Sequence, residues 1–69
     1  MKFVITINCD NAAFRGEDCG TEIARILRPI PDNVEFESAD DLEALYGDRP
    51  KSLFDIEGKH VGDITFEND

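Results

Sequence analysis

Residues 2–31 read KFVITINCDNAAFRGEDCGTEIARILRPIP, and the hydrophobic period changes once along this stretch. Phe3, Ile5 and Ile7 alternate with Val4 and Thr6, which predicts a strand over residues 2–8 with one strongly apolar face. The Asn and Asp residues that follow favour a turn. Beyond that turn, Phe14 is expected to fold inward from a loop or a single helical turn.

From Glu17 onward the apolar residues recur every three or four positions, which is the spacing of one helical face. The spacing predicts a helix near Asp18–Arg28, with acidic groups at its start and Arg25 and Arg28 near its end, as the helix dipole favours. Pro29 and Pro31 are expected to stop this helix, because proline lacks a backbone donor and restricts the residue before it.

The segment after Pro31 predicts a short strand and a second helix. Val34–Glu37 alternates, so it is expected to form a short edge strand with Val34 and Phe36 inward and Glu35 and Glu37 projecting together. Ser38 is a good N-cap for a helix whose apolar side is Leu42, Leu45 and Tyr46. Gly47 stands where a C-terminal cap is expected.

The C-terminal part predicts a hairpin over Ser52–Glu67, with its turn at Gly58 and Lys59. Phe54 and Ile56 are expected to share the core face with Ile64 and Phe66, which requires an odd-numbered loop, favouring three residues. Gly62 indicates a bulge or a close backbone approach. Asn68 and Asp69 are expected to form a polar tail.

These elements predict a single α+β domain over residues 1–69. The expected order is β-α-β-α-β-β, with a small three- to four-stranded sheet, one main helix packed on one face and a short second helix. The expected core comprises Phe3, Ile5, Ile7, Ile23, Ile26, Leu27, Phe36, Leu42, Leu45, Phe54, Ile56, Ile64 and Phe66.

Composition narrows the functional classes. The 69 residues carry 16 acidic and 7 basic groups, for a formal charge of −9. Such a charge repels nucleic acid and anionic membrane and attracts basic protein surfaces, although it also simply serves solubility. Neither a membrane-length apolar run nor a secretory signal is evident, so we expect a protein of the host cytoplasm, more readily a monomer than a dimer.

The negative charge is densest over residues 32–48, DNVEFESADDLEALYGD, which we call the acidic segment. No Lys or Arg occurs from Pro29 to Asp48. Two interpretations are open: a solvated surface, or a row of fixed anions shaped like a line of DNA phosphates and suited to a cationic groove. The candidate partner-binding residues are Asp32, Glu35, Glu37, Asp40, Asp41, Glu43 and Asp48.

Signals for catalysis are weak. His60 falls at the hairpin turn, where Asp10, Asp55 or Asp63 could orient it, but the sequence indicates no pocket. Cys9, Cys19 and His60 lack the close-spaced cysteine pair of a structural zinc site, and we expect free thiols that pack as small apolar groups. No calcium loop, phosphate-binding glycine loop or nucleophile elbow is present. We therefore expect no enzyme activity, no cofactor and no metal.

Three segments carry a resemblance. The run I5-T-I-N-C-D-N-A-A-F14, followed by E22-I-A-R-I-L27 and the hairpin D55-I-E-G-K-H-V-G62, resembles small uncharacterised proteins of phages and mobile elements. By size, charge and mixed secondary structure the chain also resembles acidic DNA-mimic anti-CRISPR proteins of the type I-C class. That resemblance implies an inhibitor that blocks recognition of the protospacer-adjacent motif by the Cascade complex.

The leading hypothesis is therefore a non-enzymatic inhibitor that presents the acidic segment to the cationic DNA-binding site of a CRISPR effector complex. The alternative is a small protein-interaction or dimerisation module. Its contact would be the mildly apolar reverse face of the sheet, through Val4, Thr6, Leu53 and Val61, and its acidic groups would serve only solubility.

Overall fold

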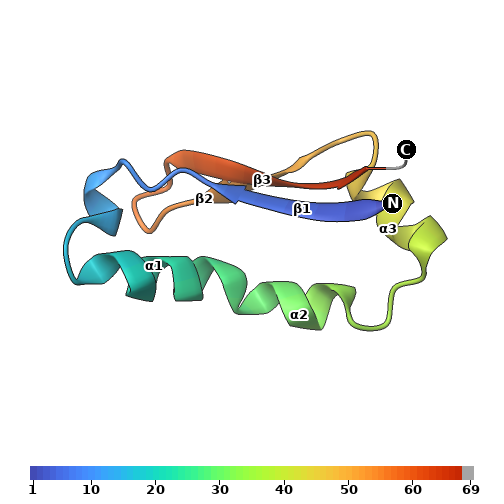
Figure 1. Cartoon of the computed structure of the whole chain (residues 1–69), viewed down its shortest axis with the longest axis horizontal. Coiled ribbons are helices and arrows are strands. Elements are labelled where there is room, and N and C mark those ends of the chain that lie inside the picture. Colours follow the sequence, from blue (N-terminus) through green and yellow to red (C-terminus); the bar gives the residue numbers. More distant parts are fainter. Residues whose placement is uncertain (68–69) are drawn as a thin grey trace.

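Three antiparallel strands form one sheet in the order β1-β3-β2, with β1 at Lys2–Ile7, β2 at Lys51–Phe54 and β3 at His60–Glu67. The computed structural model describes residues 1–67, so the expected tail of Asn68 and Asp69 lies outside the described residues. Helices cover one face of the sheet (Figure 1), which confirms the predicted α+β class and the packing of the main helix.

The helical layer consists of α1 (Asp18–Leu27) and α2 (Pro29–Val34), which run nearly end to end along the sheet (Figure 1). A single 3-10 turn, η1 (Ala12–Phe14), connects β1 to this layer and buries Phe14, as expected. The short helix α3 (Ala39–Tyr46) lies at the end of the molecule opposite η1 (Figure 1). None of the helices in residues 1–67 has the length and apolarity needed to cross a membrane.

The prediction that the first helix stops before Pro29 is confirmed, since α1 ends at Leu27, but a second helix that was not predicted follows at once. The backbone N–H of Arg28 still donates to Ala24, and α2 begins immediately with Pro29 at its first position. Donors in the first turn of a helix have no intrahelical acceptor, so prolines placed there remove no hydrogen bond. The prolines therefore restart the helix and carry Ile30 into the core.

The strand predicted at Val34–Glu37 is absent, because α2 continues through Val34. The chain is still helical at Val34 and then turns, with the Glu37 N–H donating to the Val34 carbonyl at 3.1 Å. Phe36, expected to point inward, is 90% exposed. The order is therefore β-η-α-α-α-β-β, and the sheet has three strands in the described chain.

The second predicted helix is confirmed as α3. The Ser38 hydroxyl accepts the N–H of Asp41 at 3.2 Å, which satisfies one of the free donors of the first turn. The Gly47 N–H donates to the Glu43 carbonyl at the other end. Tyr46 is buried and its ring meets Phe3 of β1 edge-on, at 5.6 Å between centroids, so α3 is fixed on the sheet.

The hairpin forms, but with a bulge that changes which side chains face the core. Leu53 pairs with Gly62, whereas Phe54 pairs with His60, so one extra residue, Val61, stands on β3. The extra residue puts Leu53, not Phe54, on the same face as Ile64. The loop Asp55–Lys59 is odd-numbered as predicted, but it holds five residues instead of the expected three.

A bulge or a close backbone approach was predicted at Gly62, and the close approach is confirmed, with the bulge at the neighbouring Val61. A Cβ atom there would lie 1.8 Å from the Thr6 carbonyl oxygen of β1. At the turn, Gly58 adopts a φ of 83°, a conformation that glycine accepts without strain.

The core lies between the sheet and the helical layer and is thin, since Ile64 alone among the described residues falls below 2% exposure. Phe36, Leu45, Phe54 and Ile56 were expected in the core but are exposed, and Phe3 and Ile5 are each 36% exposed. The residues that form the buried cluster are Phe14, Ile26, Ile30, Tyr46, Leu53, Val61, Ile64 and Phe66. Ile7, Ile23, Leu27 and Leu42 pack against it.

Candidate functional site

The acidic segment occupies one end of an elongated molecule that measures 38 × 20 × 18 Å. It begins in α2, passes through the connection to α3 and ends just beyond α3, at the end of the molecule opposite the β2–β3 turn (Figure 1). All seven predicted partner-binding carboxylates are exposed. We call this part of the molecule the acidic end.

These carboxylates are not neutralised by neighbouring cations. Within residues 1–67 the ion pairs join Lys2 to Glu67, Arg25 to Glu22 and His60 to Asp63, and none of them includes a residue of the acidic segment. Nor does any side-chain hydrogen bond in the described chain use one of the seven carboxylates. Their charge is therefore available to a partner.

One detail of the predicted ridge is wrong. Glu35 and Glu37 were expected to project together from a strand, but Glu35 caps the end of α2 in helical conformation and Glu37 follows in a turn. The spacing of an extended chain does not apply to them. Asp40 and Glu43 do share a helix, at positions i and i+3 of α3, as predicted.

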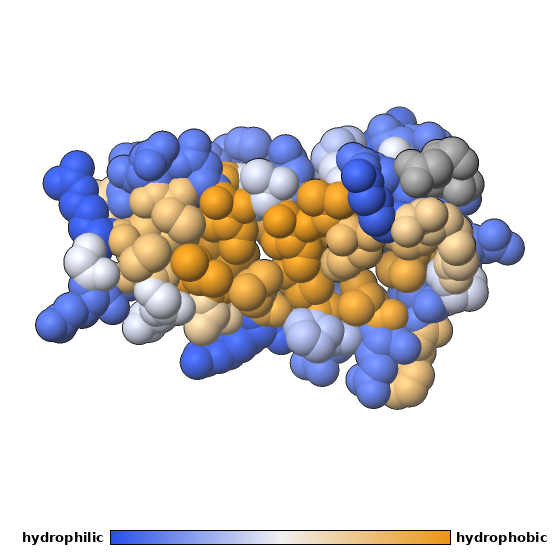
Figure 2. All heavy atoms as spheres, viewed as in Figure 1, coloured by the Kyte–Doolittle hydropathy of each residue, from blue (hydrophilic) through white to orange (hydrophobic). Residues whose placement is uncertain are grey.

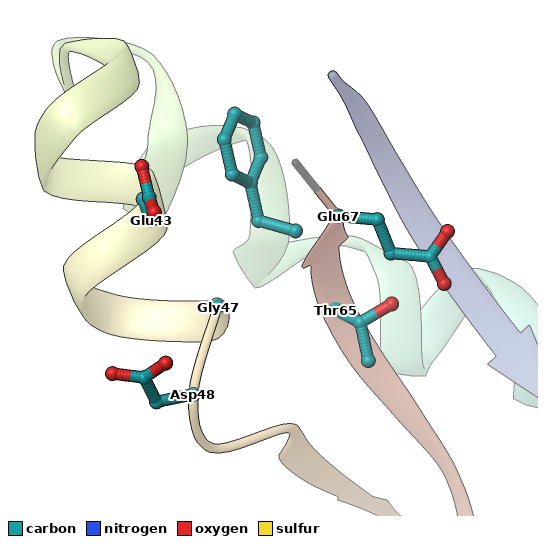
Figure 3. A pocket seen from close by; sticks show the side chains of 6 residues that line it. Glu43, Gly47, Asp48, Thr65 and Glu67 are labelled. Atoms are coloured by element: carbon teal, nitrogen blue, oxygen red, sulfur yellow. The ribbon is translucent and has the colours of Figure 1, made fainter. Parts of the chain in front are cut away.

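A shallow hollow of about 470 Å³ lies between α3 and the end of β3. Glu43, Gly47 and Asp48 line it from the α3 side, and Thr65, Phe66 and Glu67 line it from β3 (Figure 3). Of the three acidic residues that line this open depression, Glu67 is paired with Lys2 at 3.3 Å, whereas Glu43 and Asp48 take part in no ion pair of the described chain. This arrangement suits a cationic side chain supplied by another molecule.

His60 was expected to be exposed at the turn, and it is exposed at the start of β3. Of the three candidate orienting residues it meets Asp63, with 3.1 Å between Nε2 and Oδ1. Its ring also packs edge-on against Phe54 at 5.9 Å between centroids. A hollow of about 200 Å³ is present beside it, lined by Asn8, Asn11, His60, Val61 and Gly62.

The end opposite the acidic end is held together by two buried carboxylates, Asp55, which was considered above only as a partner of His60, and Glu22. Asp55, 4% exposed, organises the β2–β3 loop: its Oδ1 accepts the N–H groups of Glu57 and Lys59, each at 2.9 Å. Its Oδ2 accepts from the Asn11 side chain at 3.2 Å, which ties the loop to η1.

Glu22 fixes the same loop to α1. It is 5% exposed, and its Oε2 accepts the Ile56 N–H at 2.7 Å. Arg25 donates from Nε to Glu22 Oε1 at 2.6 Å and from Nη2 to the Phe54 carbonyl at 3.1 Å. We call Asn11, Glu22, Arg25 and Asp55 the polar latch. In the described residues every buried side-chain polar atom has a partner.

The latch lowers the pKa of both of its carboxyl groups. The hydrogen bonds that Glu22 accepts from Arg25 and from the Ile56 N–H lower its pKa, and they outweigh burial, which alone would raise it. The hydrogen bonds that Asp55 accepts from the Lys59 N–H, the Asn11 side chain and the Glu57 N–H lower its pKa, and they likewise outweigh the effect of burial. Both groups are therefore ionised at neutral pH and serve structure.

The two thiols are free, half-buried and packed against the core. The Cys9 thiol donates to the Ile7 carbonyl at 3.7 Å. Burial, together with the neighbouring Cys19 and Asp10, raises the pKa of Cys9, which keeps that thiol protonated. In the part of the chain that the structure describes, no three His, Cys, Asp or Glu side chains gather as metal ligands would.

The latch could have been anticipated in part. Asp55 precedes the Gly58 turn, and Asp side chains commonly accept backbone N–H groups two residues on. Glu22 and Arg25, at i and i+3 on α1, are a typical helix pair. What the sequence did not indicate is that the hairpin loop reaches both of them.

Fold and site together define the class: a small α+β domain with a structural polar latch at one end and free carboxylates at the other. No protein-family model, curated protein or solved structure matches the chain.

Proposed function

We propose that this protein is a non-enzymatic inhibitor of the anti-CRISPR kind, which presents its acidic end as a substitute for DNA. The observation that carries the proposal is the set of seven exposed carboxylates, free of internal ion pairs, at one end of the molecule. The target would be the cationic site with which a CRISPR effector complex binds DNA and reads the protospacer-adjacent motif.

Electrostatics supplies the mechanism. A DNA-binding groove carries Lys and Arg side chains placed to receive phosphates, and most of its affinity for DNA comes from those contacts. Carboxylates held on α2, α3 and their connection offer that groove a competing anionic surface. Because the chain carries a charge of −9, long-range attraction would also accelerate the encounter.

The hollow between α3 and β3 adds a geometric element to this proposal. Glu43 and Asp48 border it and take part in no ion pair of the described chain, so one Lys or Arg of the target could bind beside them. Arginine binds carboxylates through a planar, bidentate fork, which gives such a contact direction as well as charge.

The decisive experiment is competition with DNA on a purified type I-C effector complex. Fluorescence anisotropy of a labelled duplex carrying the protospacer-adjacent motif reports displacement by the protein. We expect wild-type protein to displace the duplex, and Asp40→Lys with Glu43→Lys to lose at least about 100-fold in potency, because two attractive contacts become repulsive. Binding should also weaken steeply with salt.

A matched control reverses two carboxylates outside the acidic end. Asp10→Lys with Glu57→Lys changes exposed residues near the polar latch and gives the same net charge, −9 plus 4, or −5, as the test variant. We expect the control to retain most of its potency. If the test variant competes as well as wild type, the acidic end is not the binding surface. A salt-independent interaction would instead favour an apolar contact.

The reverse-face contact of the alternative hypothesis does not survive in its original form. Leu53 and Val61 are buried in the core because the bulge turns them toward the helices. Val4 and Thr6 remain on the outer face, and polar side chains of β3, Asp63 and Thr65, stand opposite them.

A further inference from the structure

β1 is a free edge of the sheet. In the described chain it pairs with β3 alone, and no other strand pairs with its outer side. It has six residues, no proline, no bulge and no acidic side chain, since the first carboxylate of the chain is Asp10. Soluble proteins usually protect such an edge with charges, prolines or bulges. In β1 the single feature of this kind is Lys2 at its first position, so Phe3–Ile7 remains a template for another strand.

The backbone groups that face this edge can be identified from the ladder. The Asn8 N–H donates to Val61, and the Thr6 carbonyl points at Gly62, so the even-numbered residues bond to β3. Antiparallel ladders alternate, so the N–H and C=O groups of Phe3, Ile5 and Ile7 point away from the sheet. These are donors and acceptors without a strand partner.

The side chains of these three residues lie on the core face, yet they are incompletely covered. Phe3 and Ile5 are each 36% exposed, and Ile7 is half-buried. Figure 2 shows the result as an apolar band that opens to the surface between the sheet and the helical layer. Ile23, Leu27 and Val34 of that layer are likewise only partly buried.

We propose that two copies of this chain associate through β1, antiparallel, around a twofold axis at Ile5. In that register Ile5 meets Ile5 of the second copy, and Phe3 meets Ile7 of the second copy. All three pairs join outward-pointing backbone groups, so each pair exchanges two hydrogen bonds. The same register places apolar side chains opposite apolar side chains on the core face, because paired residues share a face.

The charge distribution favours a second copy in this orientation. The start of β1 lies beside α3, as the Phe3–Tyr46 contact shows, so β1 runs away from the acidic end. Antiparallel pairing therefore sends the two acidic ends to opposite ends of the dimer. Only Lys2 is charged in β1, so the two paired strands bring no carboxylates together.

The other sheet edge is less suited. β2 has four residues, pairs irregularly at Leu53 and Phe54, and leads into a loop that the polar latch holds.

Association at β1 would also cover apolar side chains that the thin core leaves partly exposed. The radius of gyration is 13.0 Å, above the roughly 11 Å of a compact chain of this length. A standard interface, about 800 Å² per partner, would use about one sixth of the 4903 Å² surface.

Analytical ultracentrifugation tests the proposal directly. We expect wild-type protein at about 100 µM to sediment at twice the chain mass of 7.7 kDa. Ile5→Lys should raise the dimer Kd at least about 100-fold, because two ammonium groups would meet at the twofold axis. Ile56→Lys makes the identical change at a 70%-exposed position in the β2–β3 loop and should leave the dimer intact.

Amide exchange on wild-type protein gives a second readout that does not depend on how a variant folds. We expect the N–H groups of Phe3, Ile5 and Ile7 to be protected at high concentration and to lose protection on dilution. Val4 and Thr6, bonded to β3, should stay protected throughout. A wild-type monomer at 100 µM, fast exchange at the odd-numbered residues at that concentration, or an Ile5→Lys dimer as tight as wild type overturns the proposal.

Discussion

Gly62 is the residue on which the packing of all three strands depends. A Cβ atom at this position would lie 1.8 Å from the Thr6 carbonyl oxygen, an atom of the backbone that cannot rotate away. We predict that Gly62→Ala forces β1 and β3 apart and destabilises the fold by about 3 kcal/mol or more. Thermal unfolding followed by circular dichroism measures the loss.

Gly20 provides the matched control for that substitution. It lies inside α1, and a Cβ atom there meets nothing within 4 Å. Gly20→Ala should therefore stabilise the protein by about 0.5–1 kcal/mol through helix propensity. Similar melting temperatures for the two alanine variants would contradict the close approach described for Gly62.

The latch carboxylates give the protein a defined response to acid. The folded-state pKa values of Glu22 and Asp55 lie below their ordinary values, so each group stabilises the fold when ionised. That stabilisation is complete above the unfolded-state pKa, near pH 4, and is lost as pH falls through the lower folded-state pKa. We predict a steep loss of stability below about pH 4.

The variant that isolates this effect is Asp55→Asn. At pH 7 it should melt about 5–10 °C below wild type, because the loop amides lose a charged acceptor. The difference should shrink as pH falls below 4, where the wild-type carboxyl is neutralised. Glu57→Gln removes an exposed carboxylate from the same loop and should differ little from wild type. A gap that stays constant down to pH 2 would refute the assignment.

At the scale of elements, the helical path through Pro29 and Pro31 depends on where those prolines stand. Both lie in the first turn of α2, where a missing N–H costs no hydrogen bond. We predict that Pro29→Ala changes the free energy of unfolding by less than about 1 kcal/mol. Ala24→Pro, inside α1, should cost about 3 kcal/mol or more. Denaturant titrations compare the two, and equal losses would contradict this account.

The prolines also mark where inference from the sequence failed. The strand period of residues 2–8, the helical stripe and the Ser38 cap are local signals, and all three elements formed. Whether a proline ends a helix or begins the next depends on what the following residues can bury. Ile30 supplies that burial and Phe36 does not, a difference set by the sheet opposite and invisible in the local pattern.

The bulge at Val61 is a second example. The odd loop length was predictable, but a single extra residue on β3 puts Leu53 on the core face in place of Phe54. The exposure of the acidic segment followed from its composition, and all seven carboxylates are exposed. The structural roles of Glu22 and Asp55 were missed in the part that joins them to Ile56 and Asn11, which are 34 and 44 residues away.

At the scale of the whole molecule, the two proposed surfaces occupy different places and can be tested independently. The acidic end belongs to α2, α3 and their connection, and the dimer edge belongs to β1. Reversing charges at Asp40 and Glu43 should leave sedimentation unchanged, and Ile5→Lys should leave the seven carboxylates exposed. Either proposal can therefore fail without the other.

The division of the molecule into a latched end and an acidic end also bears on how the chain can change over generations. The carboxylates of the acidic end take part in no ion pair or side-chain hydrogen bond on which the described fold depends. Their replacement costs folding little, so under the proposed function contact with the target, and not folding, would govern their identity. A lineage could in this way follow a target that alters its cationic residues, while the latch and the strands stay unchanged.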